Sequence, residues 1–183
     1  MRISFTAYAD DSIIRGELLL GGDRLSDFIA QDGSFDIERV SVEALDDGRL
    51  LTVESATISR DDLVAITASG PRGNAARRVH TRPHATRMKV GQYEVVGYLH
   101  APPSGHPYSG VLRRPVLPAT SVVMRYQIAG RPIELAYDAL LLNPTKIDWL
   151  AAASDEDVRL SKALEIPLKL DPHAKDKTGE LYI

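Results

Sequence analysis

The sequence has no cysteine among its 183 residues. That absence excludes a disulfide framework, zinc sites built on thiolates and a cysteine nucleophile. No stretch reaches the roughly 18 apolar residues that a membrane-spanning helix needs. The opening residues, "MRISFTAYADDS", also lack an apolar core of signal-peptide length. We therefore expect a cytoplasmic protein that does not use a membrane.

Acidic and basic residues are unevenly distributed along the chain. The net charge is only −3, but residues 1–69 hold 14 acidic and 6 basic residues, whereas residues 70–133 hold 10 basic residues and the single acid Glu94. The remaining residues are mildly acidic again, with 10 acidic and 6 basic residues. This segregation suits head-to-tail contacts between subunits, because the basic middle of one copy attracts the acidic ends of another.

The basic middle contains a run without acidic neighbours, "RGNAARRVHTRPHATRMK". Such a run contacts phosphate groups, meets an acidic protein surface, or is a solvated linker. The candidate interaction residues are the cations of this run and two that follow it: Arg72, Arg77, Arg78, Arg82, Arg87, Lys89, Arg113 and Arg114.

Short alternating segments dominate the pattern of apolar residues. In "RISFTAYA", Ile3, Phe5 and Ala7 share one face of an expected strand. The segment "SFDIERVSVEAL" also alternates, but the step from Ile37 to Val40 is odd-numbered, which predicts a β-bulge or burial on both faces. These short strands, separated by turn residues about every ten positions, indicate an all-β fold.

Two kinds of glycine stand out. The dipeptide Asp47-Gly48 predicts a type I′ hairpin turn, because glycine readily takes the positive φ that this turn requires. Gly16 and Gly97 interrupt apolar runs at matching places, and we expect both to lie at bends of curved strands where a side chain would be crowded.

A shift of about 81–83 positions superimposes the two parts of the chain. "IIRGELLL" falls on "YEVVGYLH", and the turns and apolar positions then follow in the same order over about 55 residues. We therefore predict a tandem repeat. The copies differ in one loop, "GDRLSDFI" against "PPSGHPYSG", so Phe28 and Tyr108 in these loops are further candidate interaction residues. A helical turn is expected at "LSDFIA", with Phe28 facing inward.

The expected architecture is two small β-barrels or β-sandwiches in tandem, followed by a helical tail. The units comprise residues 1–69 and 91–150, and residues 70–90 form a basic connector. In residues 151–183, Ser154 precedes a run of acids and is a suitable N-cap for one short helix.

No catalytic or cofactor motif is recognisable. The pair His80/His84 has metal-ligand spacing, but Pro83 between them disfavours a helix. Phosphate-binding glycine motifs and the G-x-S-x-G elbow are absent. The paired aspartates fit turns better than catalysis. We therefore predict no catalytic residue, no metal and no cofactor. An enzyme whose site is assembled from dispersed residues stays open as an alternative.

The segment Arg24-Leu25-Ser26-Asp27-Phe28-Ile29-Ala30 resembles the R-L-S-D-F-L-N phrase of a group of uncharacterised bacterial β-domains. Ile29 and Ala30 depart from the usual Leu-Asn, and the second copy lacks the phrase. The resemblance covers about a quarter of the chain. It implies a small β-domain and no established activity.

These observations together favour a non-enzymatic binding or assembly module that associates with itself or with another protein. The alternative is single-stranded nucleic-acid binding through the basic segment 72–89, with phosphate contacts from arginine and base stacking on Tyr93, Tyr98, Tyr108 and Tyr126.

Overall fold

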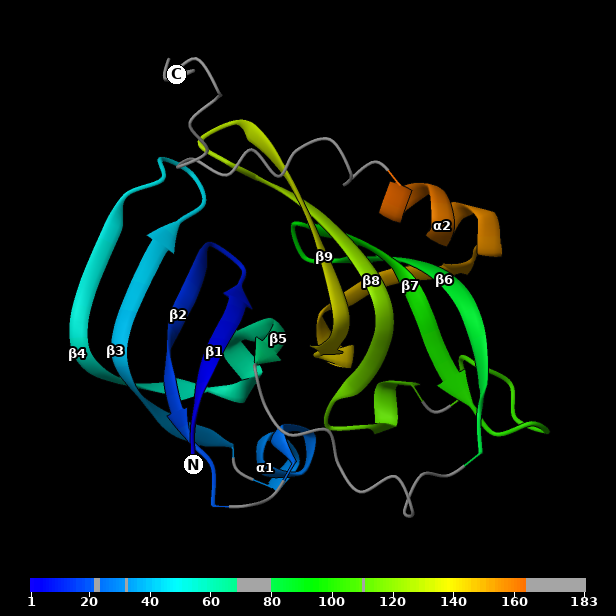
Figure 1. Ribbon diagram of the computed structural model, residues 1–183, viewed down its shortest axis with the longest axis horizontal. Coiled ribbons are helices and arrows are strands. Elements are labelled where there is room, and N and C mark those ends of the chain that lie inside the picture. The colour runs from blue at the N-terminus through cyan, green and yellow to red at the C-terminus, as the bar shows by residue number, and fades with distance from the viewer. Residues whose placement is uncertain (22–23, 32, 69–79, 110, 164–183) are drawn as a thin grey trace, which may run out of the picture.

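The computed structural model describes residues 1–21, 24–31, 33–68, 80–109 and 111–163 (Figure 1). The fold is all-β, as expected, with short helices between some strands. The strands are β1 (Arg2–Ala9), β2 (Ser12–Leu19), β3 (Ser34–Ala44), β4 (Leu50–Ser59), β5 (Leu63–Ala68), β6 (Arg82–Val90), β7 (Tyr93–Ala101), β8 (Leu117–Ile128), β9 (Arg131–Leu142) and β10 (Ile147–Ala152). The helices are α1 (Leu25–Gln31), α2 (Asp155–Ala163) and the 3₁₀ turns η1 (Arg60–Asp62), η3 (Val111–Arg113) and η4 (Pro144–Lys146).

All ten strands form one antiparallel sheet in the order β10-β6-β7-β8-β9-β5-β1-β2-β3-β4. We call β1–β5 with α1 the N-terminal half, and β6–β10 with α2 the C-terminal half. Within each half the fifth strand pairs with the first, which is followed by the second, third and fourth. The sheet is not closed, and β4 and β10 are its two edges (Figure 1).

Each half has its own hydrophobic core. The core of the N-terminal half contains Phe5, Leu18 and Ile37 from its first three strands. The core of the C-terminal half is built mainly from β6–β9, but Tyr8 and Ala65 of the N-terminal half are buried in it as well. Strands β1 and β5 therefore contribute side chains to both cores, which couples the packing of the two halves.

The expected bends occur at Gly16 and Gly97. The pairing register shifts at Gly16 between β2 and β3, and at Gly97 between β7 and β8. A Cβ atom on Gly16 would lie 2.8 Å from the Glu38 carbonyl oxygen. On the opposing strands, Arg39 and Ser121 have φ values of 52° and 51°. Both halves thus bend at a glycine that faces a bulged residue with positive φ.

The bulge at Arg39 lies between Ile37 and Val40, where the odd spacing of buried residues had two explanations. Both side chains are buried in the core of the N-terminal half. The extra residue, Arg39, restores the alternation, so a bulge and not two-sided burial accounts for the spacing.

The type I′ turn predicted at Asp47-Gly48 is wrong. Gly48 has a φ of 71°, but Asp47 has no positive φ, and the Gly48 amide donates to the Ala44 carbonyl oxygen in a longer loop. Asp47 instead accepts the amide of Arg49 through its side chain. The two-residue turn with positive φ at both positions is Ala129-Gly130, between β8 and β9.

The two predicted helices are confirmed. Helix α1 covers the "LSDFIA" phrase, and Phe28 packs partly buried against the core of the N-terminal half. Helix α2 begins after Ser154, whose hydroxyl accepts the Asp157 amide at 3.0 Å while the Asp157 carboxylate accepts the Ser154 amide at 2.8 Å. This reciprocal capping pair lowers the pKa of Asp157.

The segment expected as a basic connector is partly a strand. Residues 82–90 form β6, which pairs with β7 on one side and β10 on the other. The strand tolerates Pro83 at its second position, because a proline near a strand end disrupts few ladder hydrogen bonds. No helix within the described residues is long and apolar enough to cross a membrane.

The close approach at Gly16 leads to a first prediction. We expect Gly16→Ala to lower the free energy of unfolding by about 1–3 kcal/mol, because the added methyl group meets a backbone carbonyl that has little room to move. Gly33→Ala is the matched control, since a methyl group added there would have no atom within 4 Å. Urea unfolding of both variants measures the effect, and equal midpoints would contradict the explanation.

Candidate functional site

The basic candidates lie in several parts of the molecule. Arg72, Arg77 and Arg78 lie outside the described residues. The other five are placed by the structure: Arg82, Arg87 and Lys89 lie in β6, Arg113 ends η3, and Arg114 follows it.

Two of the three cations in β6 pair directly with β10, an edge of the sheet. Lys89 pairs with Trp149 and Arg87 pairs with Ala151 in the register of β6 with β10. The Lys89 ammonium group donates to the Gln92 carbonyl oxygen at 3.3 Å. Arg87 lies 3.9 Å from the Asp157 carboxylate. The structure thus brings positive charge to the β10 edge.

The two aromatic candidates have structural roles. The ring of Phe28 meets the ring of Phe35 edge to face, with centroids 6.0 Å apart. Tyr108 packs against the core of the C-terminal half and contacts the His106 ring. Tyr93 and Tyr126, which the sequence offered as stacking surfaces, are buried. Within the described ranges, no three metal-ligating side chains lie close enough to bind an ion.

The two halves meet through backbone pairing between β5 and β9, which we call the internal joint. Ala65 pairs with Leu142, and Ile66 pairs with Leu141. The Asn143 amide donates to the Val64 carbonyl oxygen at 2.9 Å. This bond makes the Ala65–Leu142 pair a non-hydrogen-bonded one, in which opposite side chains approach most closely.

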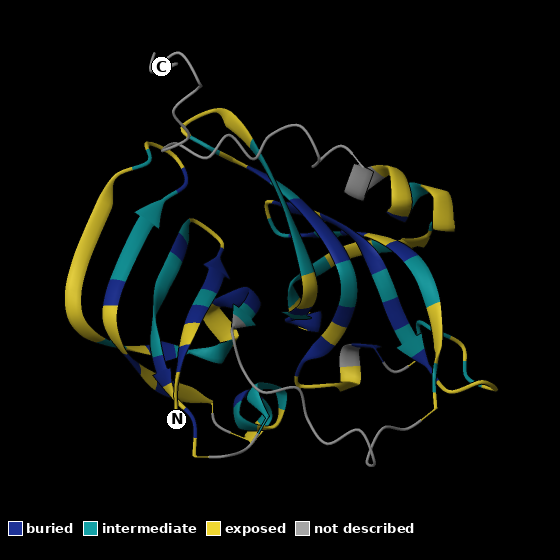
Figure 2. Ribbon diagram, in the orientation of Figure 1, coloured by how far each residue is buried: buried dark blue, intermediate teal, exposed yellow. Residues whose placement is uncertain are grey.

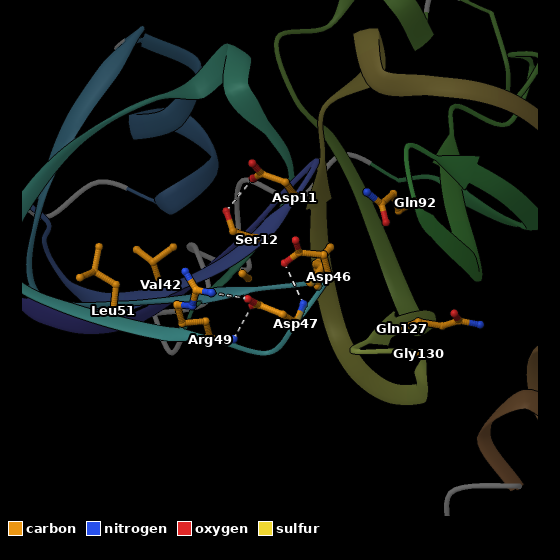
Figure 3. Close-up of a pocket in the computed structure, with 12 residues that line it drawn as sticks. Asp11, Ser12, Val42, Asp46, Asp47, Arg49, Leu51, Gln92, Gln127 and Gly130 are labelled. Atoms are coloured by element: carbon orange, nitrogen blue, oxygen red, sulfur yellow. Dashed lines mark hydrogen bonds and ion pairs between the residues drawn. The ribbon is translucent and has the colours of Figure 1, made fainter.

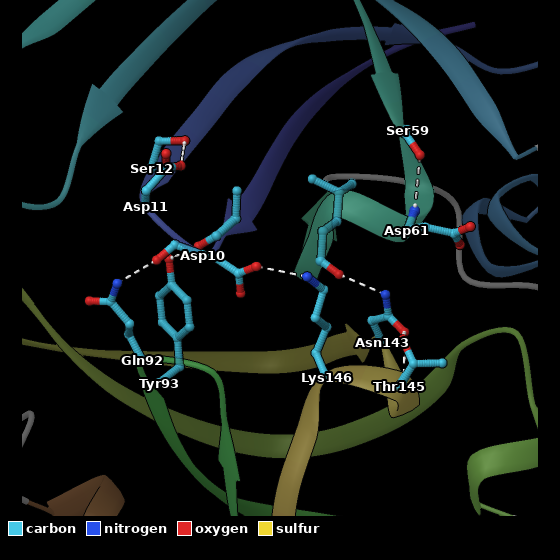
Figure 4. Close-up of polar contacts among 12 residues, drawn as sticks. Asp10, Asp11, Ser12, Ser59, Asp61, Gln92, Tyr93, Asn143, Thr145 and Lys146 are labelled. Carbon is cyan, nitrogen blue, oxygen red and sulfur yellow. Dashed lines mark hydrogen bonds and ion pairs between the residues drawn. The ribbon is translucent and has the colours of Figure 1, made fainter.

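Asn143 stabilises the internal joint through its side chain as well. Its Nδ2 donates to the Leu63 carbonyl oxygen at 2.9 Å, and its Oδ1 accepts the Thr145 amide at 3.1 Å (Figure 4). Asn143 is buried and is the N-cap of η4. One residue therefore caps a helical turn and satisfies a backbone carbonyl of the other half.

The turns beside the internal joint add polar contacts to Asp10 and to the preceding residue, Ala9 (Figure 4). Lys146 Nζ donates to the Asp10 carboxylate at 2.7 Å. The side-chain Nε2 of Gln92 donates to the Asp10 carbonyl oxygen at 2.5 Å. The buried Tyr93 hydroxyl donates to the Ala9 carbonyl oxygen at 2.7 Å. These bonds join the β1–β2 turn to the C-terminal half.

Tyr8 is the largest side chain that crosses from the N-terminal half into the other core. Its ring meets those of Tyr93, Tyr126 and Tyr137 with centroids 5.5, 5.8 and 6.3 Å away, and its hydroxyl bonds to that of Tyr137. Burial raises the pKa values of Tyr8 and Tyr93 well above 10.0, and raises the pKa of Tyr126 to about 12.

The two edges of the sheet expose apolar side chains. Leu50, Leu51 and Val53 in β4 are exposed, as is Trp149 in β10. Figure 2 shows β4 exposed along most of its length. Each edge strand carries a single charged residue and has neither lysine nor proline. Natural proteins usually protect edge strands with such residues, and neither described edge strand has them.

A hollow of about 680 Å³ lies next to the β4 edge, between the β3–β4 turn and the residues Gln92, Gln127 and Gly130 of the C-terminal half. Val42, Ala44 and Leu51 contribute apolar surface, and Asp11, Asp46 and Asp47 contribute negative charge (Figure 3). Arg49 also lines the hollow and pairs with the Asp47 carboxylate at 3.1 Å. We call this space the acidic hollow. Its volume, and the excess of aspartates over the single lining cation Arg49, suit a long cationic side chain.

The sequence patterns do not reveal either principal residue of the internal joint. Tyr8 lies on the face of β1 opposite Phe5, and the alternation that assigns one buried face gives no sign that the other is buried as well. For Asn143 a signal exists. The segment Asn-Pro-Thr-Lys has a capping residue followed by proline at the first helical position, a pattern typical of helix starts.

The role of Asn143 can be tested by substitution. We expect Asn143→Ala to lower the free energy of unfolding by about 1–3 kcal/mol, because the Leu63 carbonyl oxygen loses a donor in a buried place. Ser59→Ala is the control, because Ser59 caps η1 at a partly exposed position. Urea unfolding provides the measurement. A larger loss in the control would contradict the assigned role.

The raised tyrosine pKa values predict instability in alkali. Above pH 10 the unfolded chain loses tyrosine protons before the folded protein does, so the free energy of unfolding falls as pH rises. Below the ordinary pKa of about 10 both states are protonated and the contribution is complete. Urea unfolding from pH 9 to pH 11 should show this fall, with a smaller slope in Tyr8→Phe. Equal slopes in the two proteins would refute the assignment.

Models of known protein families, curated proteins and solved structures were compared with the chain, and none matches it. Two features of its own geometry therefore bear on what the protein does. These are the internal joint between β5 and β9, and the two apolar edges at β4 and β10.

Proposed function

We propose that the protein is a non-enzymatic assembly module that associates with itself through the edges of its sheet. The observation that carries the proposal is the pair of apolar edge strands, β4 and β10, at the two ends of one continuous sheet. An unpaired edge presents a row of backbone donors and acceptors to any strand that can approach it.

We further infer that the chain consists of two tandem units, which correspond to the two halves. Three features support this inference: the recurring strand order, the glycine bends at Gly16 and Gly97, and the bulged residues Arg39 and Ser121. In addition, a capping residue precedes a 3₁₀ turn after the fourth strand of each half. In this view the internal joint is a contact between units that happens to lie within one chain.

Two different edges on one molecule favour head-to-tail association. A contact between unlike surfaces leaves the same two surfaces free at the ends of the assembly, so it continues into a ring or a filament. The charge distribution supports this arrangement. Residues 1–69 carry 14 acidic and 6 basic residues, while β6 beside the other edge carries Arg87 and Lys89.

Single-stranded nucleic-acid binding stays a prediction. Three of its arginines lie outside the described residues, and Tyr93 and Tyr126 are buried. The same purified protein distinguishes this alternative, because binding of a labelled oligonucleotide at about 50 mM salt that weakens steeply with added salt would favour it.

Lysines introduced at the β4 edge test the assembly. We expect the mass of the wild-type protein to rise with concentration, and the dissociation constant of the double variant Leu51→Lys/Val53→Lys to increase at least tenfold. The physical reason is that a charge at the edge must be desolvated when a second strand pairs there. Light scattering and sedimentation velocity over a wide concentration range provide the measurement.

The control is Leu19→Lys, because Leu19 is 65% exposed, similar to Leu51 at 60%, but lies in β2 away from both edges. This variant should associate like the wild type, and urea unfolding should confirm that all variants remain folded. A wild-type protein that stays monomeric at every concentration would refute the proposed function.

A further inference from the structure

Strand β10 holds the same place in the C-terminal half as β5 holds in the N-terminal half. In β5, Leu63 pairs with Ala9 and, after one skipped residue, Ala65 pairs with Tyr8. In β10, Ile147 pairs with Val90 and, again after one skipped residue, Trp149 pairs with Lys89. The register shift occurs at the same place in both strand pairs. Trp149 therefore corresponds to Ala65, and Lys89 corresponds to Tyr8.

Strand β4 corresponds in the same way to β9. Ile58 pairs with Phe35 at the start of β3, and Leu142 pairs with Leu117 at the start of β8. Each is the last residue before the cap of a 3₁₀ turn. Ile58 therefore occupies the place of Leu142, which pairs with β5 at the internal joint.

We propose that β10 of one copy pairs antiparallel with β4 of a second copy in the register of the internal joint. Trp149 then lies opposite Ile58, and Leu150 lies opposite Thr57. The occupant of the β4 edge is thus a second copy of this chain. This inference rests on the proposed function and adds the partner strand and its register.

The sizes of the side chains fit this arrangement. At the internal joint, Ala65 and Leu142 are buried together in the core of the C-terminal half. Trp149 would likewise point into the core of the receiving N-terminal half, beside Ile58. The strand registers place Val53 of that half where the C-terminal half has Tyr137. Because valine is smaller than tyrosine, the receiving half has room for Trp149 where the internal joint has Ala65.

The acidic hollow fits the same arrangement. The registers place Ser12, Ala44 and Leu51, which line the hollow, where the C-terminal half has Tyr93, Tyr126 and Leu135. Tyr8 packs against both of these tyrosines, Tyr93 and Tyr126. The hollow is therefore the counterpart of the space that Tyr8 occupies.

Lys89 of the incoming copy would enter the acidic hollow, because it is the counterpart of Tyr8. Its ammonium group would approach Asp46 and Asp47, which line the hollow, and would join the existing ion pair between Asp47 and Arg49. The internal joint is closed by buried aromatic rings, whereas the joint between copies gains an attraction between opposite charges. Association should consequently weaken as the salt concentration rises, because salt screens charges near the surface.

Cysteine pairs test the register, and the chain has no cysteine of its own to interfere. One batch carries Ile58→Cys and a second, with a different tag, carries Trp149→Cys. The Cα atoms of opposite residues in a non-hydrogen-bonded antiparallel pair lie about 4.5 Å apart, within the range of disulfides. We expect a linked heterodimer under mild oxidation only after the batches are mixed. Thr57→Cys with Leu150→Cys repeats the test at the neighbouring pair without changing Trp149.

One control and two further measurements accompany the cross-link. Val53→Cys mixed with Trp149→Cys is out of register by five residues and should link at least tenfold less efficiently. In the unmodified protein, Trp149 is the sole tryptophan and is 47% exposed. Its fluorescence should shift to shorter wavelength as the protein concentration rises.

The charge contact is tested by substitution. Lys89→Glu should weaken association at least tenfold, and adding Asp47→Lys to the same chain should restore it.

The outcomes separate this inference from the proposed function. Self-association without an in-register cross-link, or with equal linking in the out-of-register control, overturns the inference and leaves the assembly module standing. A monomer at all concentrations overturns both. In-register linking together with the fluorescence shift and the charge rescue supports both.

Discussion

The arrangement of the whole molecule depends on the short backbone pairing between β5 and β9. Only this pairing makes one sheet of two five-stranded halves. Its backbone contact is limited, so side chains complete it: Asn143 binds a carbonyl of the other half, and Tyr8 fills the neighbouring core. Because β5 and β9 are used inside the chain, β10 and β4 are left as edges, and the proposed assembly follows from that asymmetry.

The two halves share a topology but differ in the residues that would close each contact. Where the halves meet, Tyr8 of the N-terminal half packs among three tyrosines of the C-terminal half, and burial raises the pKa values of Tyr8, Tyr93 and Tyr126. The corresponding space beside β3 and β4 is the acidic hollow, which Gln92, Gln127 and Gly130 of the C-terminal half also line. A contact inside one chain is made once and benefits from permanent aromatic packing. A contact between copies gains specificity and a dependence on salt from charge.

Local features of the fold could be predicted where a single residue carries the physical reason. Gly16 marks a bend because a side chain there meets a backbone carbonyl, and Ser154 begins α2 because its side chain satisfies an amide at the helix start. The prediction at Asp47-Gly48 is wrong because the Asp47 carboxylate bonds to the Arg49 amide and stabilises a longer loop. Strand β6 is predicted as a connector because its basic residues and Pro83 obscure the alternation of apolar residues. Pairing with β7 on one side and β10 on the other makes it a strand.

The sequence by itself determined the all-β class, the bends at Gly16 and Gly97 and both helices, because each depends on residues close together in the chain. At Ile37 and Val40 it left a bulge and two-sided burial open, and the structure decided for the bulge at Arg39. The sequence also showed the separation of acidic from basic segments. The tertiary structure alone decided which strands are edges, because that depends on pairing between β5 and β9, whose paired residues are more than seventy positions apart. The same pairing placed Tyr8 in the core of the other half and left Trp149 exposed. Alternation within a strand reports which faces are buried, but it carries no information about which partner buries them.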